Sequence, residues 1–118
     1  MPDLPFRRLN DAQLDRLSDD ELIDYLRDAR AHGDAEAATL ALQMLVYGYI
    51  DIIAVRVRLN LRDAPNHVVE EITERVLVSA ISSAFDGISV GEFRSWMHTI
   101  TRRRMRELLE SDTGRPGR

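Results

Sequence analysis

The sequence predicts an all-α fold with a single domain of about four main helices, one of them long and central. Apolar residues recur at helical spacing in several segments, and Ser, Asp and Gly stand where those segments begin and end. No segment has the alternating, β-branched pattern of a strand. With 118 residues, of which 44% are hydrophobic, the chain is long enough for one domain with a substantial core. We expect an N-terminal extension (residues 1–17), a helical domain (18–110) and a flexible tail or the start of a linker (111–118).

The first main helix is expected to begin after Ser18 and to end near Gly33. Ser18 and Glu21 fit a capping box, in which the Ser18 side chain accepts from a free backbone amide of the first turn and the Glu21 side chain reaches back. Three apolar residues follow at helical spacing: Leu22, Ile23 and Leu26. A short turn is expected ahead of this helix, within residues 11–17.

A second helix, capped by Asp34, is expected to run over residues 35–59. It is apolar on nearly every side between Leu40 and Val55, a pattern typical of a fully buried helix. A membrane span is the alternative for such a stretch, but Asp51 alone would cost about 2.5–3.5 kcal/mol at the centre of a bilayer. We therefore expect a buried core helix and no membrane association.

Two further helices are expected towards the C-terminus. Asp63 or Asn66 is expected to cap the third helix, with Pro65 tolerated in its first turn, and this helix is expected to run to about Phe85. Residues 86–91 (DGISVG) are a turn signal, and Ser89 and Glu92 fit a second capping box that opens the fourth helix.

The fourth helix begins apolar and ends basic. Its apolar residues share one face about 100° wide, which continues towards Arg104 and Glu107. These residues are Phe93, Trp96, Met97 and Ile100. We expect Trp96 to pack against the long helix of residues 35–59. A helix that starts in the core and ends in arginines suits a domain that binds an anion, although a solvated helix end would have the same pattern.

The third helix has two unlike faces in its first half. At about 100° per residue, three apolar side chains fall within one arc and three glutamates on the opposite side. The apolar residues are Val69, Ile72 and Val76, and the acidic ones are Glu70, Glu71 and Glu74. This acidic side is available to a basic partner. The alternative is a solvated surface whose acidic residues suit the N-terminal end of the helix dipole.

Four arginines near the end of the fourth helix have two interpretations. Two of them precede a glutamate by four residues, a spacing that braces a helix by roughly 0.2–0.5 kcal/mol per pair. These pairs are Arg103 with Glu107 and Arg106 with Glu110. Arg102 and Arg104 have no partner at that spacing, and a surface that grips phosphates and stacks bases needs such arginines near an aromatic ring. The candidates for nucleic-acid binding are Arg102, Arg103, Arg104 and Arg106.

Composition and charge exclude several classes of function. There are no cysteines, which excludes disulfides and thiolate metal sites. All 16 basic residues are arginine, and the net charge is −5 over residues 1–36, −2 over 37–101 and +3 over 102–118. The overall charge of −4 argues against a general polyanion binder but allows a focused contact at the C-terminal end. The N-terminus lacks a signal pattern, so a cytoplasmic location is expected.

No residue pattern supports catalysis or a bound cofactor. His67 stands three and four residues before Glu70 and Glu71, the only metal-like spacing in the chain. One histidine near two carboxylates lacks the convergent ligands of a stable metal site. There is no glycine-rich phosphate loop and no Ser, His and Asp arrangement that can be singled out. We expect neither an enzyme nor a metal or cofactor protein.

Two segments resemble region 2 of bacterial extracytoplasmic-function sigma factors. Residues 68–76 (VVEEITERV), followed after a loop by residues 93–104 (FRSWMHTITRRR), are similar to an acidic Val-Val-Gln-Glu helix that precedes a Phe-Arg-x-Trp helix with a basic end. The acidic first helix, the Gly-Asp after it and the long apolar helix also resemble the opening of that family. The likeness covers residues 18–110 and implies a sigma region 2-like bundle.

The resemblance implies a transcription-initiation module that binds core RNA polymerase and the promoter −10 region. By position, Glu70, Glu71 and Glu74 become polymerase-binding candidates, and the four arginines become DNA-binding candidates. Two positions depart from the family, because residues 65–67 (PNH) replace Ala-Glu-Asp and Arg103 replaces an asparagine. The alternative is a degenerate sigma-like helical adaptor or regulator that acts through protein–protein contacts, with an anti-sigma or other regulatory protein as partner. The sequence leaves open whether the chain is a fragment of a longer sigma factor or a free-standing relative.

Overall fold

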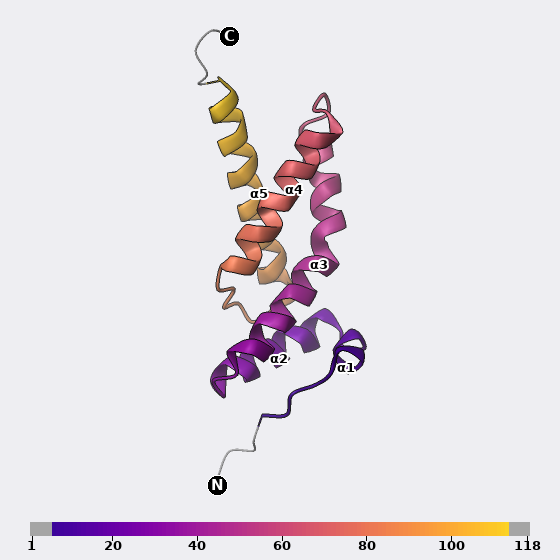
Figure 1. Cartoon of the computed structure of the whole chain (residues 1–118), viewed down its shortest axis with the longest axis vertical. Coiled ribbons are helices and arrows are strands. Elements are labelled where there is room, and N and C mark those ends of the chain that lie inside the picture. Colours follow the sequence, from indigo (N-terminus) through magenta and orange to yellow (C-terminus); the bar gives the residue numbers. More distant parts are fainter. Residues whose placement is uncertain (1–5, 114–118) are drawn as a thin grey trace.

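The computed structural model describes residues 6–113 and their side chains as far as Glu110. This part of the chain contains five helices and no strand (Figure 1), which confirms the all-α prediction. The helices are α1 (Asp11–Asp15), α2 (Asp19–Ala31), α3 (Ala35–Asn60), α4 (Asn66–Ser82) and α5 (Val90–Thr113). The expectation of a flexible tail falls partly on residues 114–118, which lie outside the described residues.

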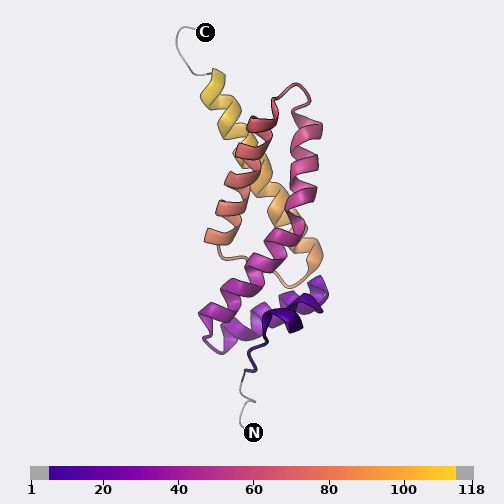
Figure 2. The same cartoon turned by 45° about the vertical axis from the view of Figure 1, so that its right-hand side comes forward.

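The central helix α3 organises the bundle. Its N-terminal half packs against α2, and α4 runs back beside its C-terminal half. The last helix, α5, packs mainly against α4 and passes behind α3 (Figure 2). The short helix α1 and residues 6–10 before it lie against the α2 end of the bundle, where Leu14 is fully buried.

The beginnings of the first helices follow from side-chain caps. Ser18 Oγ accepts a hydrogen bond from the Glu21 amide at 3.2 Å, and Glu21 Oε1 accepts one from the Ser18 amide at 2.9 Å, so the predicted capping box is confirmed. Asn10 and Gln13 make a second such box, which is why a true helix, α1, forms where only a turn was expected. Asp34 caps α3 through the Ala37 amide, as predicted.

The start and end of α4 differ from the prediction. Neither Asp63 nor Asn66 is the cap, because Pro65 occupies that position and no side chain closes the first turn. The helix ends at Ser82, and Phe85 lies beyond it in the loop to α5. Phe85 is nevertheless buried, since its ring lies 5.4 Å from that of Phe93 at a right-angled tilt.

The loop between α4 and α5 is held at three points. The Arg30 guanidinium of α2 donates to the Phe85 carbonyl. Gly87 approaches the Phe85 ring so closely that a Cβ there would lie 2.5 Å from the Phe85 Cζ atom. Ser89 Oγ accepts from the Glu92 amide at 3.2 Å, as the predicted capping box requires. The Glu92 carboxylate accepts from the Ile88 amide rather than from the Ser89 amide, so the second half of the box is displaced by one residue.

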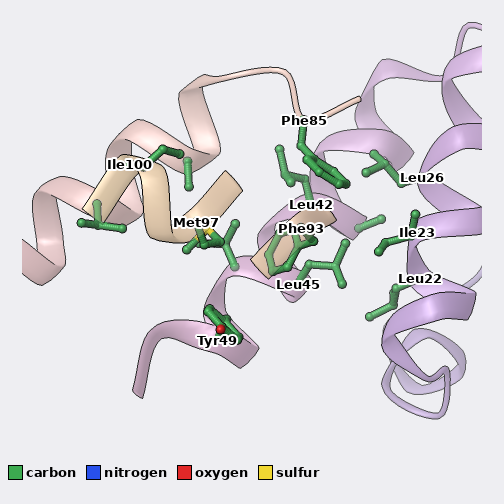
Figure 3. Packing of buried hydrophobic residues seen from close by; sticks show 14 of the residues in the cluster. Leu22, Ile23, Leu26, Leu42, Leu45, Tyr49, Phe85, Phe93, Met97 and Ile100 are labelled. Carbon is green, nitrogen blue, oxygen red and sulfur yellow. The ribbon is translucent and has the colours of Figure 1, made fainter. Parts of the chain in front are cut away.

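The hydrophobic core contains buried residues from all five helices, and Figure 3 shows the part where α2, α3 and α5 meet. In this close-up the Phe93 and Met97 side chains of α5 lie over α3, and the leucine and isoleucine side chains of α2 approach from the other side. Trp96 is only half-buried, and its ring contacts are with Phe85 at 5.2 Å and Phe93 at 6.0 Å. The Phe93 ring in turn meets that of Tyr49 of α3 at 5.9 Å, so Trp96 is linked to α3 through Phe93. Direct packing of Trp96 on α3 stays a prediction.

The expectation that α3 is buried on all sides is wrong. Only 39% of the most apolar stretch of α3 is buried inside the bundle. By length and composition alone, this helix could also cross a bilayer. Several large apolar side chains in its C-terminal half are exposed: Tyr47, Ile52, Val55 and Leu59. In its C-terminal half, α4 and α5 lie on one side of α3 and the opposite side faces outwards.

Candidate functional site

One side of α5 forms a row of exposed arginines. Arg102, Arg103 and Arg106 are exposed because their positions on the helix lie away from the buried Met97 and Ile100. Ser95 and Thr99 continue the same side towards the N-terminus of the helix. Three of the four predicted DNA-binding residues are therefore together on one accessible surface.

Arg104 does not belong to that surface. It is half-buried on the core side of α5, and its Nη1 atom donates to Glu107 Oε2 at 2.6 Å. Its Nε atom is buried without a hydrogen-bond partner among the described residues. Arg104 has no partner at i, i+4, as the sequence indicated, but it pairs with Glu107 at i, i+3, a spacing that the sequence analysis did not weigh for it. Glu107 accordingly pairs with Arg104 and not with Arg103 in the described ion pairs.

Two further arginines extend the basic surface around His98. Tyr49 and His98 are hydrogen-bonded between the tyrosine oxygen and Nε2 at 3.0 Å, which ties α3 to α5. Partial burial lowers the pKa of His98, and the positive charges of Arg56, Arg102 and Arg94 lower it further. Three guanidinium groups thus lie near enough to this imidazole to disfavour its positive charge. None of them takes part in the ion pairs described within residues 6–110.

We call the exposed arginines that follow one another along α5 at multiples of four residues, together with the neighbouring arginine of α3, the basic face. Its members are Arg56, Arg94, Arg102 and Arg106. Arg103 is exposed beside Arg106 but lies nine residues after Arg94, which puts it on the opposite side of the helix from Arg94. Sequence reasoning missed Arg94 and Arg56. Arg94 could have been found, because Arg94, His98, Arg102 and Arg106 follow one another at intervals of four residues. Arg56 could not, since only the packing of α3 on α5 brings it to this surface.

The exposed side of α4 carries the predicted glutamates. Val69, Ile72 and Val76 are buried as predicted. Glu70, Glu71 and Glu74 are exposed, and we call them the acidic face. Glu71 Oε1 accepts from Arg75 at 2.8 Å, which partly neutralises it.

The acidic face continues into an apolar residue. Val78 is 58% exposed and stands one turn beyond Glu74. A shallow depression in the seam between α4 and α5 is lined by Glu71, Glu74, Val78 and Arg104, among others. Arg104 thus contributes to the border of the acidic face rather than to the basic face.

The structure assembles no metal centre from its described residues. His67 is exposed and lines a cleft of about 580 Å³ between the α3–α4 loop and the end of α5, together with Glu71 and Leu108. No group of three or more histidine, aspartate or glutamate side chains converges within residues 6–110. The cleft is largely lined by the loop that follows α3, and its chemistry is mixed rather than acidic.

Three comparisons with known proteins found no match for this chain. No protein-family model matches the chain, and neither the curated proteins nor the solved structures contain a significant match. The resemblance to sigma factor region 2 accordingly remains a prediction from the residues quoted above.

Proposed function

We propose that the chain is a non-catalytic, sigma factor-like transcription module, which binds core RNA polymerase through the acidic face and promoter DNA through the basic face. The observation that carries the proposal is that opposite charges occupy separate exposed surfaces of two adjacent helices, α4 and α5. Such separation suits a protein that bridges a basic partner and an anionic one.

The basic face has dimensions that suit a nucleic-acid strand. Arg94 and Arg106 are twelve residues apart on α5, or about 18 Å along the helix axis. This length corresponds to about five nucleotides at the 3.4 Å rise per nucleotide of one strand. Arginines in such a row contact phosphates, and they supply affinity without reading the bases. The half-buried Trp96 packs on Phe85 and Phe93, so we assign the binding to arginine rather than to stacking on that ring.

The acidic face is assigned to the polymerase. Glu70 and Glu74 are one turn apart and take part in none of the ion pairs described within residues 6–110. Their charges are available to a basic surface, and Val78 beside them supplies an apolar contact. Interfaces of this kind combine charge complementarity at the rim with apolar contact at the centre.

The test is capture of purified bacterial core RNA polymerase by the immobilised chain. The variant Glu70→Arg/Glu74→Arg should lose at least ten-fold in apparent affinity, with an unchanged thermal midpoint, because neither side chain supports the fold. The matched control Asp15→Arg/Asp24→Arg reverses two exposed acidic residues elsewhere and should bind normally. Equal binding by both variants would remove the polymerase assignment.

A helical adaptor that binds another protein is the second candidate. It is favoured by the exposed apolar residues, Val78 on α4 and those on α3, because protein interfaces use such side chains. The two candidates differ in their ligands. An adaptor would bind neither core polymerase nor DNA at physiological salt, whereas a sigma-like module would bind the polymerase through Glu70 and Glu74.

A further inference from the structure

The C-terminal half of α3 carries an apolar stripe on its outer side. Ile52, Val55 and Leu59 follow at intervals of three and four residues and are 50%, 54% and 62% exposed. This spacing is the a/d pattern of helices that pair side by side. In Figures 1 and 2 this half of α3 runs along the outer edge of the bundle, with α4 and α5 on its inner side.

The same side of α3 is covered in its N-terminal half. Ala37 and Ala41 stand eighteen residues before Val55 and Leu59, which is about five turns, so each shares an angular position with its counterpart. Both alanines are buried, at 3% and 0% exposure, in the half of α3 that packs against α2. The cover provided by α2 therefore ends midway along α3, and the apolar stripe begins where it ends.

We propose that a second copy of this chain covers the stripe, with the two α3 helices antiparallel and related by a two-fold axis. In the register that fits best, Ile52 lies opposite Val55 of the second copy, and Gly48 lies opposite Leu59 of the second copy. Each contact then occurs twice, as a two-fold interface requires. The proposal is independent of the polymerase and DNA assignments, because the stripe shares no residue with the acidic or basic face.

Charge complementarity is the first argument for this occupant. Asp51 and Arg58 are exposed residues that border the stripe, seven positions apart on one helix. In the antiparallel register each Asp51 lies beside Arg58 of the second copy, which makes two pairs of opposite charge across the interface. Within residues 6–110 neither side chain is part of a described ion pair, so both are available.

Shape is the second argument, and it also sets the direction of pairing. A Cβ atom added to Gly48 would meet nothing within 4 Å, so Gly48 is an open notch in the surface. An antiparallel partner places the large Leu59 side chain over this notch, whereas a parallel partner would place glycine against glycine. The antiparallel overlap also spans residues 47–60 on each chain, about 21 Å, and stops where α2 begins to cover α3.

Sedimentation equilibrium of the chain over a range of concentrations tests the proposal. We expect the wild-type chain to reach twice the monomer mass with a Kd in the micromolar range, as suits a short helix pair. Asp51→Arg and Arg58→Asp should each weaken the dimer at least ten-fold, because each places like charges together. The double variant Asp51→Arg/Arg58→Asp should recover the wild-type Kd, since the exchanged charges again face opposite signs.

Each other outcome identifies a different arrangement. A parallel dimer would place Asp51 near Arg56 of the second copy, so Arg58→Asp alone would have little effect and the double variant would not recover, which overturns the antiparallel register. A wild-type chain that stays monomeric at several hundred micromolar overturns dimerisation. Flotation of that monomer with phosphatidylcholine–phosphatidylglycerol vesicles, lost in Val55→Arg, would assign the stripe to a lipid surface instead.

Two controls separate association from folding. Val55→Arg should abolish the dimer while leaving the helical circular dichroism spectrum and thermal midpoint of the dilute chain unchanged, because the side chain is already half exposed. Glu70→Arg, on the acidic face, should leave the dimer intact. If Glu70→Arg weakens the dimer as much as Asp51→Arg, the effect is one of net charge and the specific interface is refuted.

Discussion

Neutralising two arginines of the basic face should weaken single-stranded DNA binding and make the affinity less sensitive to salt concentration. Arg94 and Arg102 flank His98 one turn to either side and take part in none of the ion pairs described within residues 6–110. If each of the four arginines of the basic face neutralises one phosphate, log K should fall with log salt at a slope of about −2.8. The variant Arg94→Gln/Arg102→Gln loses two contacts, so its slope should be about −1.4.

These slopes give distinct salt responses. Between 50 and 200 mM salt the affinity of the wild-type chain should fall about 50-fold, and that of the double variant only about 7-fold. Fluorescence anisotropy with a labelled oligonucleotide of about 12 nucleotides, within the site size of single-strand binders, measures both. The thermal midpoint should change little, because both side chains are exposed.

Two matched arginine variants complete the experiment. Arg27→Gln removes an exposed arginine of α2, far from the basic face in sequence, and should leave the slope unchanged. Arg104→Gln should also preserve the slope, because that guanidinium pairs with Glu107 on the core side of α5. The assignment fails if Arg94→Gln/Arg102→Gln has the wild-type slope, or if Arg104→Gln lowers it as much as a single variant of the basic face.

Three further predictions concern stability. Phe93→Ala should lower the free energy of unfolding by about 3–5 kcal/mol because the ring is 3% exposed, and Trp96→Ala by less, since that ring is half-buried; urea denaturation of both variants checks the order. Gly87→Ala should destabilise the chain by about 1–3 kcal/mol through the clash with the Phe85 ring, and a neutral effect in the same assay would contradict the close approach. Because the pKa of His98 is lowered in the folded chain, the unfolded chain binds the imidazole proton at a higher pH than the folded chain does. Stability should therefore fall as pH drops below about 6.5, and His98→Gln should abolish this pH dependence.

The sequence correctly predicted the helix starts that are closed by a nearby side chain. Ser18 and Asp34 close the first turns of α2 and α3 with their own side chains, and these caps involve residues only three positions away. The two-faced character of α4 was equally predictable, because it depends on a spacing within one helix. The end of α4 was not, since Phe85 is buried by rings of α5 rather than by a continuation of its own helix.

The sequence predicted only those parts of the candidate site whose residues lie on a single helix. Arg102, Arg103 and Arg106 share an exposed side of α5, as helical geometry requires. The same geometry places Arg104 on the continuation of the apolar face, as the sequence indicated, and there it pairs with Glu107 and is not available to DNA. Arg56 and the apolar stripe of α3 depend on which neighbouring helix covers which side, and a single sequence does not contain that information.

The anchoring of the loop before α5 determines how the basic face would meet a ligand. Arg30 holds the loop to α2, and the Phe85 ring contacts the rings of both Phe93 and Trp96, so the first turns of α5 are anchored to the bundle through the loop. A surface built on such a helix is already in its binding geometry before the ligand arrives. Association then loses little backbone entropy, and the remaining cost is the immobilisation of the long arginine side chains.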